Sequence, residues 1–218
     1  GPGPALPRLP VPSEPVRDDF TASRLGLEWN HIRNPIPANY DLSTRPGWLR
    51  LTGTAATLDD RASPTALIRR QRHFALRFGT RMQFAPATDG EEAGMTLRLN
   101  EALHVELCLR RDSDQTRLLL RQTDRDKKTE LHALTVTAGI VEFHVGADRD
   151  TFSFSYVLPD GSRHEAGEVP TAGLAVEASW QRGIPCFTGL MIGMYATNNG
   201  GTSMAPADFD WFDYAPVD

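Results

Sequence analysis

Cysteine is scarce in this sequence, since only Cys108 and Cys186 occur among its 218 residues. One pair is too few to hold a fold of this size together through disulfides, and its spacing matches no zinc-binding signature. We therefore predict two free thiols. No apolar run approaches the roughly 20 residues that a membrane-spanning helix needs, and the sequence itself shows no basic-then-apolar signal peptide. We expect a soluble protein that binds no membrane and lies in the cytoplasm rather than being secreted.

An excess of basic charge is also missing. The chain has 23 Lys and Arg against 28 Asp and Glu, which gives a net charge of −5 and a pI near 5.7. Proteins that bind the phosphate backbone of nucleic acids draw their affinity from a basic surface. Glycine-rich phosphate loops and the G-x-S-x-G nucleophile motif are absent too. We therefore expect no nucleic-acid partner, no nucleotide chemistry and no serine-hydrolase activity.

The pattern that is present is an alternation of apolar and polar residues with period two. Hydrophobic residues make up 40% of the chain, which is enough for a real core. The alternation is clearest in residues 103–110, 141–145 and 152–156, as in strands with one buried and one wet face. About a dozen such runs, one of them at residues 74–84, are separated by turn signals. The charged stretches 112–114 and 124–130 are predicted hairpin tips. The sequence predicts an all-β jelly-roll sandwich of two antiparallel sheets.

Prolines stand at positions 2, 4, 7, 10, 12 and 15. Such spacing favours extended polyproline II and prevents a sheet ladder. Residues 1–17 are therefore predicted to be a proline-rich linker that implies an upstream domain, or else a surface tail. Residues 18–218 are predicted to form the β-sandwich domain. The chain begins at Gly1 without a methionine, so we interpret it as a fragment or a processed chain.

Aspartates near the two ends of the predicted domain indicate a metal site. Terminal strands of sandwiches commonly lie side by side, which would bring together Asp19, Asp208 and Asp210. Calcium requires several oxygen ligands of this kind. We hypothesise a structural calcium ion there and expect no other cofactor. In the alternative interpretation, neighbouring aromatic side chains pack inside while the aspartates remain in water.

Exposed aromatic rings can stack on the apolar faces of sugars. Trp29 and Trp180 lie in irregular stretches and are candidate carbohydrate contacts, whereas Trp48 and Trp211 lie in strand patterns and are expected in the core. Glycoside hydrolysis needs two carboxylates across the scissile bond, and nothing in the sequence nominates such a pair. We therefore interpret the acidic residues as solvated edge charges and turn caps. We expect the histidines on the polar side of their strands, such as His104, to face solvent or to lie on a sheet face.

Several ordered motifs resemble the β-sandwich module that follows the catalytic propeller in glycoside hydrolase family 43 β-xylosidases and α-L-arabinofuranosidases. They extend from about Asp18 to Tyr214. The first is "DDF" followed by "LGLEWN" and "RNP", and the second is "RPGWLRL". The others are "LIRRQ", "DGEEAG", and the pair "FTGL" with "ADFDWFDY" near the end. The resemblance implies a concanavalin-A-like sandwich, in agreement with the strand pattern.

The resemblance also implies a function. The family's catalytic carboxylates lie in the propeller, so none is carried over to this chain. Phe187 matches a loop aromatic that helps to close the substrate pocket, with Arg182 as a nearby polar contact, although Cys186 departs from the family pattern. We therefore expect a non-catalytic accessory module of a xylan- or arabinan-degrading glycosidase. Its partners would be the catalytic propeller or a second copy of the chain, and carbohydrate.

Two alternatives remain at this point. The first is an independent carbohydrate-binding module that recognises xylan-type oligosaccharides through Trp29 or Trp180. The second is an enzyme with a carboxylate pair that the sequence does not reveal.

Overall fold

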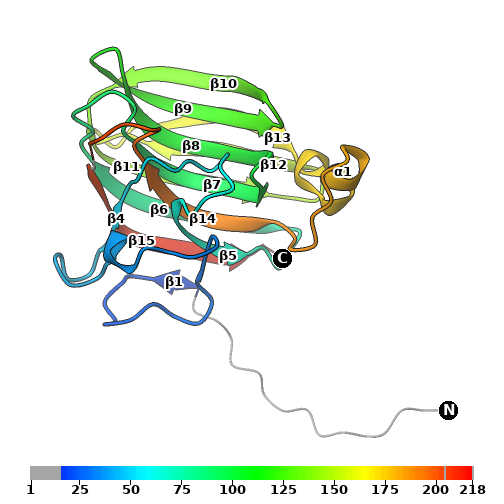
Figure 1. Ribbon diagram of the computed structural model, residues 1–218, viewed down its shortest axis with the longest axis horizontal. Helices are drawn as coiled ribbons and strands as arrows, with labels where there is room; N and C mark the ends of the chain where they lie inside the picture. The colour runs from blue at the N-terminus through cyan, green and yellow to red at the C-terminus, as the bar shows by residue number, and fades with distance from the viewer. Residues whose placement is uncertain (1–15, 204, 218) are drawn as a thin grey trace, which may run out of the picture.

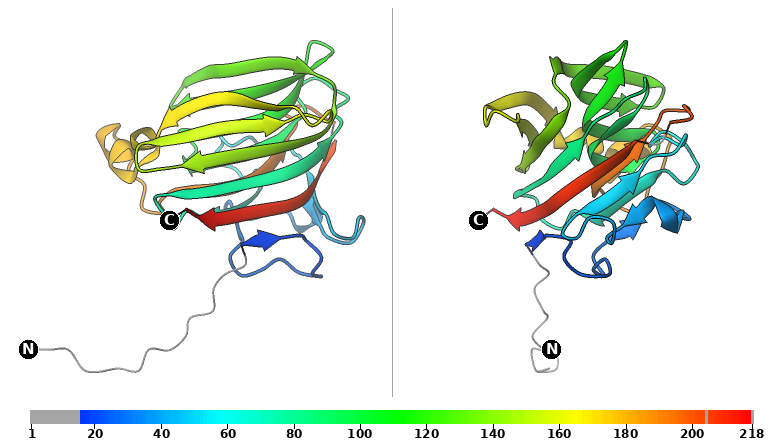
Figure 2. Two further views of the ribbon diagram at one scale, coloured as in Figure 1. Left: turned by 180° about the vertical axis from the view of Figure 1, so that it is seen from behind. Right: turned by 90° about the vertical axis from the view of Figure 1, so that its left-hand side faces the viewer.

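A computed structural model describes residues 16–203 and 205–217, so the predicted linker or tail lies almost wholly outside the described residues. Two antiparallel sheets pack face to face (Figures 1 and 2). The eight-stranded sheet has the order β13 (Arg163–Pro170), β12 (Thr151–Val157), β11 (Gly139–Ala147), β6 (Leu76–Phe84), β15 (Pro206–Pro216), β4 (Leu49–Thr52) and β3 (Tyr40–Asp41), and β1 (Arg17–Asp18) pairs with β15. The all-β sandwich prediction is confirmed.

The seven-stranded sheet has the order β10 (Lys127–Val136), β9 (Gln115–Asp124), β8 (Leu103–Asp112), β7 (Glu92–Asn100), β14 (Met191–Thr197), β5 (Thr65–Arg70) and β2 (Asn30–His31). Within residues 16–203 and 205–217, helical structure is limited to η1 (Pro37–Asn39), η2 (Thr171–Leu174) and α1 (Val176–Gln181). Among the residues that the structure describes, no helix has the length and apolar character needed to cross a membrane.

The alternating residues form the core between the two sheets. In β11, the side chains of Val141, Phe143 and Val145 are buried in the main hydrophobic cluster. Val145 lies opposite Phe78 of β6, so apolar side chains of neighbouring strands meet on the same face. Burying each of these large side chains contributes about 1.5–3 kcal/mol. The burial of one face therefore determines the register of each strand.

The predicted hairpin at residues 112–114 is confirmed. Asp112 pairs with Gln115, and the two residues between them, Ser113 and Asp114, both have positive φ. This is the backbone of a tight two-residue turn, whose twist matches that of the flanking strands. The second charged stretch forms a shorter tip than predicted, because β10 already begins at Lys127.

The segment 53–64, which joins β4 to β5, crosses the outer face of the seven-stranded sheet and is called the covering segment below. Figure 1 shows it in cyan, in front of β7 and β8. Thr54 bridges to Thr197 of β14, Asp59 forms an ion pair with Lys128 of β10, and Leu58 is buried. Because of this cover, His104 is fully buried, so the expectation that it faces solvent was wrong.

Both cysteines are free, as predicted, and the structure buries both of them. Cys108 lies on β8 beneath the covering segment with Leu58 and Tyr195. Cys186 packs with Leu99 and Leu103 near α1. Burial raises the pKa of the Cys108 thiol well above its ordinary value, so this thiol stays protonated at neutral pH.

Candidate functional site

The feature of the surface that most resembles a binding site is a pair of exposed aromatic rings. Trp180 lies on α1 and Phe187 on the segment 182–190 between α1 and β14. Their side chains are 53% and 82% exposed. Their ring centroids are 5.3 Å apart with an interplanar angle of 89°, so the edge of one ring faces the other. The exposure expected for Trp180 is confirmed, and the two rings are called the Trp180–Phe187 patch below.

The backbone on either side of Phe187 is anchored to the sandwich. The amide of Cys186 donates a hydrogen bond to the hydroxyl of Ser179 at 3.2 Å, and its thiol lies 3.3 Å from the carbonyl oxygen of Leu99. On the other side, Arg70 of β5 donates to the carbonyl oxygen of Thr188. The Phe187 ring is thus exposed on an ordered support, which reduces the entropy lost when it binds a partner.

Arg182 helps to build this support. Its Nε donates to both carboxylate oxygens of Asp124, at 3.1 and 3.0 Å, where β9 ends. Its Nη1 donates to the carbonyl oxygen of Ala178 at 3.1 Å and so satisfies an acceptor near the end of α1. The structure therefore places Arg182 close to the patch, with its guanidinium joining α1 to β9.

Trp29 is not part of this surface, and the expectation that it is exposed was wrong. It is 8% exposed. Its indole N–H donates to Asp18 at 2.8 Å, and its ring lies 5.1 Å from that of Phe212 in an edge contact. It packs between the start and the end of the domain because β1 pairs with β15. With its ring covered, Trp29 offers no face on which a sugar could stack.

The three aspartates of the hypothetical calcium site are each paired with arginine. Asp208 binds Arg50 through two hydrogen bonds of 2.7 and 2.9 Å. Asp210 pairs with Arg81 at 3.3 Å. The remaining contacts are those of Asp19 with Arg17 at 2.5 Å and of Asp208 with Arg45 at 3.1 Å. Within the described part of the chain, no three His, Cys, Asp or Glu side chains form a group suited to a metal.

We expect calcium to leave the melting temperature of the protein unchanged. Burial opposes ionisation of Asp208, yet its hydrogen bonds to Arg50 and Arg45 outweigh this and lower its pKa. A cation would have to displace these guanidinium groups. The measurement is thermal unfolding followed by circular dichroism, first after EDTA treatment and then with millimolar CaCl₂. A rise of more than about 3 °C would show preferential binding to the folded state and contradict this interpretation.

A buried carboxylate pair does exist, but it is committed to a structural network. The guanidinium of Arg121 on β9 lies 2.7 Å from Glu92 of β7 and 2.6 Å from Glu106 of β8. The hydroxyl of Tyr195 donates to Glu92 at 2.8 Å. All four residues are buried beneath the covering segment, so the expectation that the acidic residues are solvated was wrong for Glu92 and Glu106.

Burial raises the pKa of Glu92, but the charge and hydrogen bond of Arg121 outweigh it and hold the pKa below its ordinary value. The carboxylate is therefore an ionised acceptor rather than a proton donor. It is also shielded from solvent, so it does not meet the geometry of a glycosidase acid. Sequence reasoning missed this network because its members come from four strands, β7, β8, β9 and β14. Their shared face becomes interior only through contacts with distant segments, among them Leu58 of the covering segment.

Comparison with known proteins yields a family and several relatives. Residues 17–215 match the family model of the β-xylosidase C-terminal concanavalin A-like domain. The chain is 34% identical to the non-reducing end α-L-arabinofuranosidase BoGH43B of Bacteroides ovatus, over 99% of this chain and 40% of that protein. It is 30% identical to a putative β-xylosidase of Escherichia coli K12, over 92% of this chain and 38% of that protein.

Similar solved structures also belong to glycoside hydrolase family 43 proteins. The Bacteroides ovatus xyloglucan PUL GH43B structure superimposes with a TM-score of 0.90 at 34% identity, covering 98% of this chain and 42% of that one. The GH43 BlXynB protein from Bacillus licheniformis superimposes with a TM-score of 0.89 at 30% identity, covering 98% of this chain and 41% of that one. The chain thus spans about two fifths of the length of the relatives that it matches.

Proposed function

Because the chain belongs to the family of β-xylosidase C-terminal concanavalin A-like domains, we propose that it is a non-catalytic accessory module of a family 43 glycosidase. In this proposal it packs against a catalytic domain and helps to shape the substrate pocket of that domain. The observation that carries the proposal is the Trp180–Phe187 patch on its anchored support. The partner is inferred from the relatives, of which the chain matches only 38–42%.

The energetics of the patch favour docking. Isolated exposed apolar residues are common on protein surfaces, but two adjacent large rings form a contact of the kind that dominates binding energy at interfaces. Transfer of one such ring from water into an interface contributes about 1.5–3 kcal/mol. The anchors at Cys186 and Thr188 have already ordered the backbone around Phe187, so little of this gain is lost to ordering on binding.

The non-catalytic assignment is supported by the state of the carboxylates. Glu92 and Glu106 are buried around Arg121, and Asp208 and Asp210 are held by arginines. A glycosidase needs two accessible carboxyl groups on opposite sides of one scissile bond. None of these four meets that requirement, which agrees with a chain that relies on catalytic groups elsewhere.

The proposal is tested in a chimera. The matching C-terminal part of the Bacteroides ovatus arabinofuranosidase is replaced by this chain, and hydrolysis of an aryl arabinofuranoside is compared with that of the relative truncated before this part. We expect the chimera to exceed the truncated enzyme by about tenfold or more in kcat/KM. Phe187→Ala in the chimera should lower kcat/KM about tenfold, which is the effect expected from the loss of one buried aromatic contact.

The matched control is Leu27→Ala, because Leu27 is a fully exposed apolar side chain on the loop between β1 and β2. It should leave kcat/KM unchanged. A chimera no better than the truncated enzyme would contradict the proposal, as would equal effects of the two substitutions. Turnover by the isolated chain would show that the chain is itself an enzyme.

A second candidate function is an independent carbohydrate-binding module. It is favoured by the exposed ring of Trp180, since an indole can stack on the apolar face of a pyranose. Trp29 is excluded from this role by its burial. The Trp180→Ala variant in the calorimetry described below distinguishes this candidate, which requires that the substitution abolish binding of xylo-oligosaccharides.

A further inference from the structure

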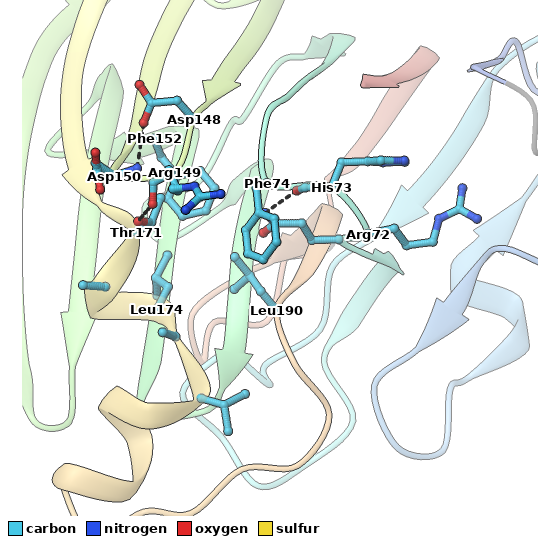
Figure 3. A pocket seen from close by; sticks show the side chains of 14 residues that line it. Arg72, His73, Phe74, Asp148, Arg149, Asp150, Phe152, Thr171, Leu174 and Leu190 are labelled. Atoms are coloured by element: carbon cyan, nitrogen blue, oxygen red, sulfur yellow. Dashed lines mark hydrogen bonds between the residues drawn. The ribbon is translucent and has the colours of Figure 1, made fainter. Parts of the chain in front are cut away.

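A pocket of about 500 Å³ lies beside α1, apart from the Trp180–Phe187 patch (Figure 3). Three chain segments enclose it. They are residues 71–74 between β5 and β6, the turn 148–150 between β11 and β12, and residues 171–176 of η2 and the start of α1. Neither Trp180 nor Phe187 lines it. Pockets of this size commonly bind small molecules when an apolar lining is combined with a few polar groups.

The lining has that composition. Its floor includes Phe152 and Leu174, which are buried. One wall is Phe74, which remains 76% exposed although it is a large apolar side chain. Figure 3 shows Phe74 and Leu190 across the hollow from Phe152 and Arg149. The strand that we expected to begin at Phe74 begins at Leu76, so the loop presents this ring to solvent instead of placing it in the sheet.

The polar rim is held in an ordered turn. The carboxylate of Asp148 accepts hydrogen bonds from the amides of Asp150 and Thr151, at 2.8 and 2.7 Å, and these bonds lower its pKa. The hydroxyl of Thr171 donates to the carbonyl oxygen of Arg149 at 2.7 Å. The amide of Thr171 donates to the carbonyl oxygen of Asp150 at 2.9 Å. The turn is thus fixed at both ends before any ligand arrives.

The charges of the rim select the chemistry of the ligand. Asp148 and Asp150 supply acceptors, while the Arg149 guanidinium, 6.0 Å from the centre of the Phe74 ring, supplies donors. On this turn an anionic ligand would meet the carboxylates of Asp148 and Asp150, and a cationic ligand would meet Arg149. Hydroxyl groups avoid both conflicts, because they donate to carboxylates and accept from guanidinium. Pyranose rings combine such hydroxyls with an apolar C–H face that suits an aromatic side chain. We propose that this pocket binds a neutral oligosaccharide through Phe74 and the 148–150 turn.

The test is isothermal titration calorimetry of the 218-residue chain with xylotetraose and with cellotetraose. We expect saturable binding of at least one of them with a Kd on the order of 1 mM. Phe74→Ala should weaken it about tenfold or more, and Asp150→Asn should weaken it less. Because Phe74 is exposed, its removal should leave the melting temperature unchanged, so a loss of binding reports on the pocket rather than on folding.

Leu27→Ala is the matched control, since Leu27 is an exposed apolar side chain outside both the pocket and the Trp180–Phe187 patch. It should leave the Kd unchanged. Absence of saturable heat with both sugars up to about 20 mM would overturn the proposal. Binding that Trp180→Ala abolishes and Phe74→Ala preserves would also overturn it, because the sugar would then lie on the Trp180–Phe187 patch.

Discussion

Replacing Arg121 by methionine is expected to lower the free energy of unfolding by about 3–5 kcal/mol, because it leaves two ionised carboxylates buried without their cation. Glu92 and Glu106 both depend on this guanidinium at 2.7 and 2.6 Å. Both carboxylates are buried, so water would not replace the lost cation. In a chain of this length the loss corresponds to a fall of about 10 °C in melting temperature. Urea unfolding followed by tryptophan fluorescence measures the effect.

The control lies on the same strand. Arg117 of β9 pairs with Glu130 at 2.9 Å, but that carboxylate is about half exposed. An ion pair in water contributes about 0–1 kcal/mol, so Arg117→Met should be nearly neutral. Similar effects of the two substitutions would contradict the structural role of the network. Combining Arg121→Met with Glu92→Gln and Glu106→Gln should recover part of the lost stability, since no unpaired charge then remains.

Gly193→Ala is expected to destabilise the protein by about 3 kcal/mol. This is the upper end of the range of stability losses that follow the addition of one methyl group to a well-packed interior. Gly193 lies on β14 in the middle of the seven-stranded sheet, between β5 and β7. A Cβ atom built there would lie 2.7 Å from the Cα of Ile68 and closer still to the carbonyl oxygen of Leu67. Both contacts are with backbone atoms of β5, which no side-chain rotation can relieve.

Gly146 is the matched control, because it lies in β11 and a Cβ atom there would meet no atom within 4 Å. Gly146→Ala should be neutral or stabilising by about 0.5 kcal/mol, since it reduces the freedom of the unfolded chain. Thermal unfolding of both variants provides the comparison. Equal melting temperatures for the two variants would show that β5 and β14 separate easily enough to admit a methyl group.

The strands could be predicted from the sequence because alternation is a local signal. Residues such as Val141, Phe143 and Val145 must share one face of any strand that contains them, and that face is buried. Elements with weaker patterns were missed. One is β13, which contains two glutamates and a glycine in eight residues. Another is α1, which is only six residues long and owes its helical form to packing rather than to propensity.

The candidate sites were predictable in part. Trp180 was expected on the surface from its irregular surroundings, and Phe187 was singled out by a motif, and both are exposed. The same reasoning failed for Trp29, because an irregular local sequence does not reveal a distant partner such as Phe212. Phe74 was assigned to a strand, since nothing in its neighbours indicates that β6 begins two residues later.

The sequence by itself determined the all-β class, the alternating core faces and the tight turns, because each follows from residues within a few positions of one another. Tertiary structure alone decided which polar faces become interior. Leu58 of the covering segment packs with Cys108, Leu119 and Tyr195, and Glu92, Glu106 and Arg121 form a buried network on the same sheet. Pairing of β1 with β15 likewise buries Trp29. Burial of a polar group depends on what covers it, and that cover comes from chain segments far away in sequence.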